Sequence, residues 1–273
     1  MSVNPTIGVF DSGFGGLTVL RALLSRIPQA RYAFLGDTAR LPYGSKSRRT
    51  IARYATESAQ FLVREQGAEY LVIACNTASA LALDAIQDAV PVPVLGVIEP
   101  GAASARGASQ SGDVLVIATD ATVQSHAYAA ACRATGLRAL EKACPLLVPL
   151  VEEGWTQHPV TEEVFRIYLH ELLREASTEG MSPDTLVLGC THYPLLRAMI
   201  EKAVPAGMRV IDSAEATAEA AAQLFHPQAS GEHLPLGQAV CCFATDSVEK
   251  FERLGSRFLE RPVGHVELVD LGG

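Results

Sequence analysis

Residues 70–77 read YLVIACNT, and residues 185–192 read TLVLGCTH with the same pattern. Each stretch is an apolar run of strand length, followed by a small residue, a cysteine and a polar residue that can open a helix. The repeat therefore places Cys75 and Cys190 at the carboxyl ends of two strands. Because open α/β sheets bind ligands beyond the carboxyl ends of their strands, two facing sheets could hold one small substrate between these cysteines.

A second repeat strengthens the duplication, since IGVFDS at residues 7–12 is similar to LVIATD at 115–120. Each of these runs precedes its own cysteine strand by a similar distance. Further strands are expected at 32–36, 92–97 and 208–211. Strands that alternate with helices indicate parallel sheets, so we predict an α/β fold with two pseudo-symmetric parallel-sheet lobes and an active site in the cleft between them.

Helical patterns lie between several of the expected strands. Ser47 can cap a helix that Gly67 ends, and Pro194 fits the first turn of a helix that runs to Val204. Residues 160–176 are amphipathic, and a further helix is expected at 213–225. The apolar stripe expected along 160–176 consists of Val164, Ile167, Tyr168, Leu172 and Leu173.

Composition narrows the class of protein. The chain has 273 residues, of which 48% are hydrophobic and 19% charged, enough for one large or two modest α/β domains. Its net charge of −8 argues against nucleic acid as a partner, since phosphate binding needs clustered Lys and Arg. No signal-peptide pattern and no apolar run of about 18 residues is present, so we expect a cytoplasmic protein that does not bind membranes.

The six cysteines lack C-x-x-C spacing, which disfavours a disulfide framework or a structural zinc site. In a reducing compartment they should be thiols. Four of them have no polar residues around them in the sequence and are interpreted as structural: Cys132, Cys144, Cys241 and Cys242.

Residues 11–16, DSGFGG, follow a strand and open a helix, so their amides could hold an anion. A dinucleotide site is one interpretation, with Asp37 as the acid that binds ribose. Thr18 at the third glycine position and the charge of Asp11 count against it. A carboxylate beside a thiol is better suited to moving protons, and His192 could similarly tune the thiol of Cys190.

Taken together, the motifs resemble those of glutamate racemases. The resemblance runs from residue 7 to about 200 and rests on six stretches: FDSGFGG (10–16), GDTARLPYG (36–44), CNTAS (75–79), ATDATV (118–123), PLVEEG (149–154) and GCTHYP (189–194).

The resemblance implies a cofactor-independent enzyme, without metal, that converts L-glutamate to D-glutamate for peptidoglycan synthesis. It implies a first lobe of residues 1–98 and 208–273, with the C-terminal segment returning to it, and a second lobe of residues 99–207. Cys75 and Cys190 would be the two bases, with Asp11 assisting the first and His192 and Glu152 near the second. The residues implied to contact substrate are Asp11, Ser12, Tyr43, Gly44, Asn76, Thr77, Thr119, Thr122, Thr191 and His192.

Three alternatives stay open. A racemase of the same superfamily could act on aspartate or another amino acid. Cys75, Cys190 and His192 could instead form a zinc site with an open position, or the two cysteines could form a redox pair, which their wide spacing disfavours. The sequence also leaves open whether the chain forms a homodimer.

Overall fold

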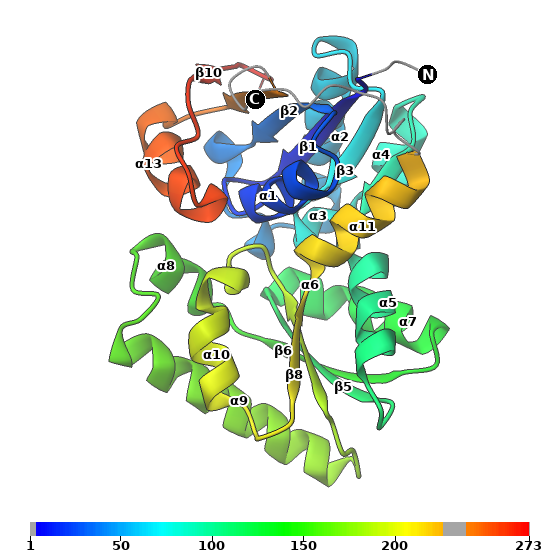
Figure 1. Cartoon of the computed structure of the whole chain (residues 1–273), viewed down its shortest axis with the longest axis vertical. Helices are drawn as coiled ribbons and strands as arrows, with labels where there is room; N and C mark the ends of the chain where they lie inside the picture. Colours follow the sequence, from blue (N-terminus) through cyan, green and yellow to red (C-terminus); the bar gives the residue numbers. More distant parts are fainter. Residues whose placement is uncertain (1–3, 226–238, 273) are drawn as a thin grey trace.

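The computed structural model describes residues 4–225 and 239–272, which form two lobes, each around a parallel β-sheet (Figure 1). In these residues the first lobe has a six-stranded sheet of order β10-β9-β2-β1-β3-β4, and the second has a four-stranded sheet of order β6-β5-β7-β8. The strands are β1 (Thr6–Asp11), β2 (Arg31–Gly36), β3 (Tyr70–Ile73), β4 (Val94–Gly96), β5 (Asp113–Ala118), β6 (Arg138–Ala143), β7 (Thr185–Gly189), β8 (Arg209–Asp212), β9 (Val240–Ala244) and β10 (Val266–Leu268).

The strand orders confirm the duplication predicted from the sequence. β2-β1-β3-β4 in the first lobe and β6-β5-β7-β8 in the second are the same arrangement, with β1 and β5 each paired to a strand on both sides. β3 and β7 therefore hold equivalent places. Cys75 and Cys190, which follow these strands, lie at equivalent ends of two different sheets.

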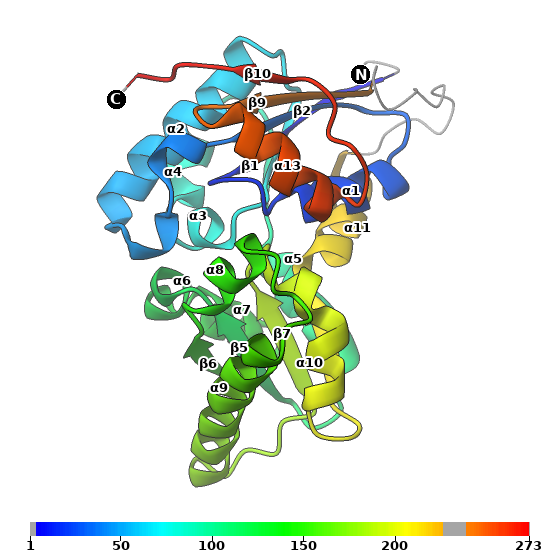
Figure 2. The ribbon, with the colours of Figure 1, turned by 90° about the vertical axis from the view of Figure 1, so that its left-hand side faces the viewer.

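Helices cover both sheets (Figure 2). The predicted cap of α2 is present, since the Ser47 side chain accepts a hydrogen bond from the Thr50 backbone N–H. The helices are α1 (Leu17–Arg26), α2 (Arg48–Arg64), α3 (Asn76–Leu81), α4 (Leu83–Ala89), α5 (Ile98–Ala108), α6 (Asp120–Ser125), α7 (Ala127–Ala134), α8 (Leu147–Glu152), α9 (Pro159–Thr178), α10 (Arg197–Ala203), α11 (Ser213–Phe225) and α13 (Val248–Leu259), with single 3-10 turns at Thr38–Arg40, Tyr43–Ser45 and Tyr193–Leu196.

Helix α9 exists where it was predicted, but its buried face differs from the predicted stripe. The buried side chains are Thr161, Phe165, Leu169, Leu172 and Ala176, whereas Ile167 is 51% exposed. The Thr161 hydroxyl donates a hydrogen bond to the Trp155 carbonyl. This polar residue can therefore be buried at a position that a search for apolar residues does not find.

The residues after 208 contribute strands to both sheets. β8 pairs with β7 and so belongs to the second sheet. Helix α11 then packs against α1 of the first lobe and α5 of the second, and β9 joins the first sheet beside β2. In Figure 1 the chain passes from β8 upward through α11 between the lobes.

Three strands were not predicted. β6 has the sequence RALEKA, whose helix-favouring residues occupy a sheet edge with one neighbouring strand. β9, VCCFA, and β10, VEL, are short, and they lie on the side of the first sheet away from β4, with β10 at its edge. The apolar run of β9 was the available signal for that strand.

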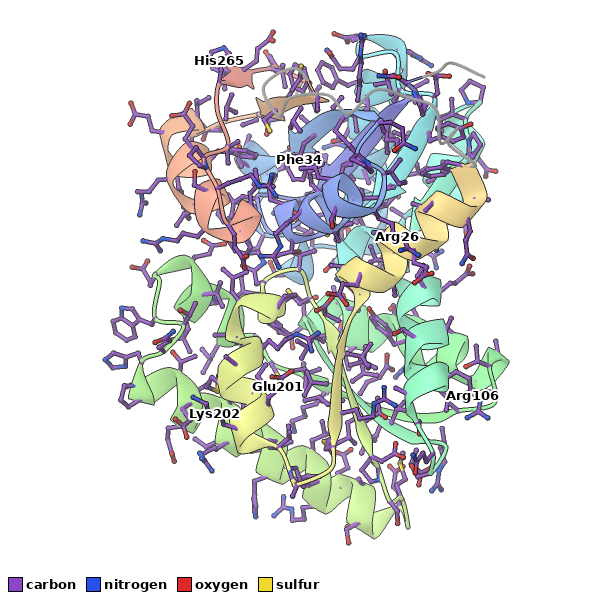
Figure 3. All side chains as sticks on the ribbon, in the orientation of Figure 1. Arg26, Phe34, Arg106, Glu201, Lys202 and His265 are labelled. Carbon is purple, nitrogen blue, oxygen red and sulfur yellow. The ribbon has the colours of Figure 1, made fainter. Side chains whose placement is uncertain are left out.

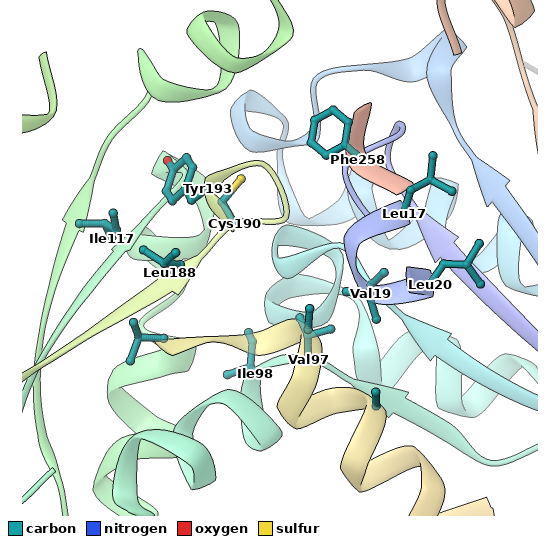
Figure 4. Close-up of a cluster of buried hydrophobic side chains, with 14 of the residues drawn as sticks. Leu17, Val19, Leu20, Val97, Ile98, Ile117, Leu188, Cys190, Tyr193 and Phe258 are labelled. Atoms are coloured by element: carbon teal, nitrogen blue, oxygen red, sulfur yellow. The ribbon is translucent and has the colours of Figure 1, made fainter. Parts of the chain in front are cut away.

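Buried apolar side chains of the two lobes form a continuous cluster. Figure 4 shows Cys190 beside Leu188 and Tyr193 of the second lobe, with Leu17 of α1 and Phe258 of α13 across from it. Many charged side chains lie on the surface, as Glu201 and Lys202 on α10 illustrate in Figure 3. None of the helices in the described residues has the length and hydropathy needed to span a membrane.

Candidate active site

A cavity of about 300 Å³ lies between the lobes at the carboxyl ends of β3 and β7. Both cysteines line it. Of the residues singled out in the sequence, those that line the cavity are Ser12, Tyr43, Gly44, Cys75, Asn76, Thr77, Thr119, Glu152, Cys190, Thr191 and His192. Asp11 and Thr122 lie behind this wall, both buried. The sequence therefore identified most of the polar lining.

Cys75 ends β3 and caps helix α3. Its Sγ lies 3.4 Å from the Ser12 Oγ, and it accepts a hydrogen bond from the Ala78 backbone N–H at 3.4 Å. Burial and, to a smaller extent, the nearby charge of Asp11 together raise the pKa of Cys75 to about 12, although hydrogen bonds with Ser12 and Ala78 act in the opposite direction. Without substrate, Cys75 is therefore a thiol, ready to donate a proton.

Asp11 sits at the end of β1 next to this thiol. Its Oδ2 accepts a hydrogen bond of 2.9 Å from the Gly13 backbone N–H. Burial raises the pKa of Asp11, while the charge of His192 and the amides of the glycine-rich turn act in the opposite direction. The carboxyl group is thus placed to influence protons on both sides of the cavity.

Cys190 ends β7 and has a different set of neighbours. The Cys190 Sγ is 4.0 Å from the His192 Nδ1, and the His192 Nε2 is 3.3 Å from a Glu152 carboxylate oxygen. Burial alone lowers the pKa of His192, but hydrogen bonds to Cys190 and Glu152 raise it to about 10. His192 is therefore a cation at neutral pH, and its ring faces the Cys190 sulfur.

The chain of contacts from Cys190 continues to the first lobe. Lys250 of α13 donates a hydrogen bond of 3.3 Å to the other oxygen of Glu152, which belongs to α8. Burial raises the pKa of Glu152, but His192 and Lys250 outweigh it and the pKa is lowered. Glu152 is thus a carboxylate held between two cations, one from each lobe.

Hydroxyl and amide groups form another wall of the cavity. Thr77, Thr119 and Thr122 hydrogen-bond to one another through their hydroxyls at 2.9–3.2 Å. Asn76 accepts a hydrogen bond of 2.7 Å from the Tyr128 hydroxyl, whereas its Nδ2 is buried and has no partner in the described part of the chain. Such groups can bind carboxylates and stabilise developing negative charge.

The dinucleotide interpretation of the first motif is wrong. Asp37 is fully buried and accepts hydrogen bonds from Arg40, Tyr43 and Thr245, so it is not available to a ribose. Instead it anchors the loop that carries Tyr43 into the cavity wall.

The glycine-rich residues 11–16 allow the two lobes to pack closely. A Cβ on Gly15 would lie 2.3 Å from the Thr191 Oγ1 and 2.7 Å from the His192 Nδ1. Only glycine leaves room there for the loop that follows Cys190.

The other site chemistry considered for the sequence was a zinc centre. In residues 4–225 and 239–272, no group of three His, Cys, Asp or Glu side chains is arranged to hold a metal ion, so Cys75, Cys190 and His192 are not a ligand set. All six cysteines lie in the described residues and are free of disulfide bonds, as predicted. Cys241, however, is exposed rather than part of the core.

Five residues that line the cavity were not singled out as site residues. Leu41 and Pro42 lie within the predicted loop, and Val148 and Pro149 lie on or beside the PLVEEG motif. These four form apolar wall and were within reach of the motif analysis. No sequence pattern identified Lys250 as a site residue, because its place in the cavity wall depends on how α13 lies against the second lobe.

Comparison with known proteins places the chain in a family. Residues 16–221 match the model of the Asp/Glu/hydantoin racemase family. A glutamate racemase of Koribacter versatilis is 51% identical, with 99% of each chain covered, and one of Syntrophus aciditrophicus is 46% identical, with 97% of this chain and 96% of the other covered.

Solved structures agree. Glutamate racemase RacE1 of Bacillus anthracis superposes with a TM-score of 0.88 at 35% identity, and glutamate racemase of Francisella tularensis, solved with D-glutamate, with 0.86 at 34%. Both comparisons cover 99% of each chain. The resemblance found in the sequence motifs is thereby confirmed, and the chain belongs to the Asp/Glu/hydantoin racemase family.

Proposed function

We propose that this protein is an isomerase that interconverts L- and D-glutamate without a cofactor, using Cys75 and Cys190 as its two bases. The observation that carries the proposal is that one cysteine from each lobe lines the same small cavity. Racemisation requires one group to take the α-proton from one face of the substrate and another to supply a proton to the opposite face. Two equivalent strand ends on facing sheets provide two such groups.

The proton balance follows from the two environments. His192 is a cation beside Cys190, and Cys75 is a thiol. The Cys190 thiolate takes the α-proton, and the Cys75 thiol gives its proton to the other face of the carbanion. The products are the opposite enantiomer, a Cys190 thiol and a Cys75 thiolate, so the next turnover in the reverse direction exchanges the roles.

The α-proton is much less acidic than a thiol, whose ordinary pKa is about 8.5. The enzyme must therefore stabilise the carbanion. The buried Nδ2 of Asn76, which has no protein partner in the described residues, is a preorganised donor at the cavity, Thr77 and Thr119 add hydroxyl groups to its wall, and apolar Leu41, Pro42 and Val148 limit the water around them. These donors also suit the two carboxylates of glutamate.

Glutamate is favoured over aspartate by the comparisons. The relatives of 46–51% identity are named glutamate racemases, whereas an aspartate racemase of Picrophilus torridus shares 19% identity at a TM-score of 0.56 and supports the fold alone. Competition assays with aspartate test this choice: aspartate should be turned over at least about tenfold less efficiently, since a missing methylene loses hydrophobic contact and alignment.

The substrate and product also suggest the setting. We place the reaction in the supply of D-glutamate for peptidoglycan synthesis, as the resemblance implied. Six free thiols are the state expected in a reducing compartment, which supports a cytoplasmic location. The homodimer stays a prediction that light scattering can test. We also propose that the lobes divide near residues 98 and 212, because β8 belongs to the second sheet.

The deciding experiment follows the α-proton. Either enantiomer of glutamate is incubated with metal-free protein in deuterium oxide, and optical activity and α-deuteration are recorded. The first product molecules should be almost fully deuterated while the remaining substrate holds little deuterium, because the donating thiol has exchanged with solvent. Loss of optical activity with unlabelled early product would contradict the two-cysteine mechanism, and no loss of optical activity would contradict racemisation of glutamate altogether.

A further inference from the structure

Tyr128 lies at the junction of the two lobes and belongs to none of the motifs. It is on α7 of the second lobe and is fully buried. Its hydroxyl reaches Asn76 of α3 in the first lobe at 2.7 Å, and Ser213, where the chain leaves β8 for α11, also hydrogen-bonds to it. One hydroxyl group therefore connects both lobes and the segment that joins them.

Two glycines make room for the Tyr128 ring. A Cβ on Gly189 would lie 2.9 Å from the Tyr128 Cε2, and one on Gly101 would lie 3.4 Å from its Cε1 and its hydroxyl oxygen. Gly189 immediately precedes Cys190. The ring is thus held against the strand end that carries one cysteine, while the hydroxyl contacts the residue that follows the other cysteine.

The hydrogen bonds that link Ser213, Tyr128 and Asn76 can run in one direction only. The Ser213 hydroxyl donates to Tyr128, and burial keeps the phenol protonated, so Tyr128 has one proton to donate. That proton goes to the Asn76 Oδ1. The amide oxygen of Asn76 is thereby turned toward Tyr128, and the Nδ2 must point elsewhere, where it has no protein partner in the described residues. Asn76 is also part of the cavity lining.

We infer that Tyr128 is a positioning residue that fixes the side-chain amide of Asn76 so that its Nδ2 donates to a carboxylate of the substrate. Without the Tyr128 hydroxyl, the amide could turn over and present its oxygen, which repels a carboxylate. Ser213 takes part by orienting the Tyr128 proton. This inference rests on the proposed racemisation of glutamate, and it assigns to Tyr128 a role in substrate affinity rather than in proton transfer.

The test is a double-mutant cycle of Tyr128→Phe and Asn76→Ala. Tyr128→Phe keeps the ring that fills the space beside Gly189 and removes the hydroxyl alone. We expect it to raise KM for both enantiomers about tenfold and to change kcat less than about threefold, because a hydrogen bond to a charged group is lost on binding. In the Asn76→Ala background the same substitution should change KM less than about twofold, since no amide remains to be positioned.

Binding itself is measured by calorimetry with D-glutamate in the Cys75→Ala/Cys190→Ala protein, which removes turnover. The dissociation constant should follow KM. Tyr32→Phe is the matched control, because the Tyr32 hydroxyl is buried and donates to the Leu23 and Ile27 carbonyls of the first lobe, away from the cavity. It should leave KM unchanged.

Two results would overturn the inference while leaving racemisation intact. One is an unchanged KM in Tyr128→Phe, and the other is the same rise in KM with and without Asn76. If Tyr128→Phe does not fold, Ser213→Ala takes its place and should raise KM about threefold in the Asn76 protein and not in the Asn76→Ala protein; an unchanged KM there would equally refute the role. An inactive wild-type protein would refute the proposed function instead.

Discussion

The ends of β3 and β7 occupy equivalent positions in the two sheets, yet their cysteines have opposite electrostatic surroundings. Cys75 has a buried carboxyl group as its neighbour, whereas Cys190 has an imidazolium supported by a carboxylate. The duplicated fold thus supplies two sulfurs, and the residues around them make the two unlike.

In the two-base mechanism proposed above, only a mixed pair of one thiol and one thiolate can act. Two thiols cannot remove the α-proton, and two thiolates cannot return one. In the structure a carboxyl group lies beside the Cys75 thiol and an imidazolium lies beside Cys190. Each prediction below changes one side of this comparison.

The largest effect should come from removing either sulfur. Cys75→Ala and Cys190→Ala should each lower racemisation at least about 10²-fold in both directions, because every turnover uses one cysteine as base and the other as acid. Optical activity measured from each enantiomer checks this. Cys241→Ala is the control, since Cys241 is exposed and outside the cavity lining. A folded Cys75→Ala or Cys190→Ala protein with a wild-type rate would disprove the two-base assignment.

A smaller but still large loss is expected from Gly15→Ala, which perturbs the Cys190 side from the other lobe. The added methyl group would lie within 3 Å of Thr191 and His192, so the loop must shift. A displacement of about 1 Å in catalytic groups can cost about 10²-fold, and we expect a fall of 10- to 100-fold in kcat/KM. Gly107→Ala is the control, because a Cβ there meets nothing within 4 Å. Equal rates for the two variants would show that close packing at Gly15 is unimportant.

The sequence was sufficient for the parts of the site that follow strand ends. Cys75 and Cys190 could be found because an apolar run fixes where a strand stops, and the next residue is then placed by geometry. The cap at Ser47 was similarly local. The motif containing Asp37 was located correctly, but its role depended on Thr245, more than 200 residues away in the chain, so the dinucleotide interpretation could not be excluded beforehand.

Contacts made by packing were outside the reach of the sequence. Tyr128 and Lys250 act across the lobes, and neither lies in a motif or follows a predicted strand. The stripe of α9 was misplaced for a related reason, because Thr161 is buried and Ile167 exposed only in the context of the sheet beneath. Burial of a polar residue depends on a partner that the local pattern does not name.

The pH dependence of kcat tests the role of His192 beside Cys190. Glu152→Gln removes a negative charge that raises the pKa of His192, so this pKa should fall from about 10 toward its ordinary value of 6.5. If cationic His192 supports the Cys190 thiolate, the alkaline limb of kcat should move to lower pH by about one unit. A pH profile of kcat from 6 to 10.5 measures this. His192→Asn should lower kcat more than it changes KM. If the alkaline limb of kcat does not shift in Glu152→Gln, Glu152 has no part in setting the protonation of His192 during catalysis.

The smallest effect is expected at Lys250, the outer member of the same chain of charges. The Lys250 side chain is 45% exposed, so solvent screens its pairing with Glu152. Lys250→Met removes a positive charge near His192 while Glu152 stays ionised at alkaline pH, so the alkaline limb should move to higher pH, opposite to Glu152→Gln, by less than about half a unit, with kcat reduced less than about threefold. Added salt should narrow the difference between wild type and Lys250→Met, because it screens the Lys250–Glu152 pair, which only the wild type has. Lys250→Arg keeps the charge and should restore the wild-type limb, whereas Lys202→Met, on the outer surface of α10, should leave it in place. A shift in Lys250→Met as large as that in Glu152→Gln would mean that the bridge between the lobes, and not the carboxylate alone, sets the proton state on the Cys190 side.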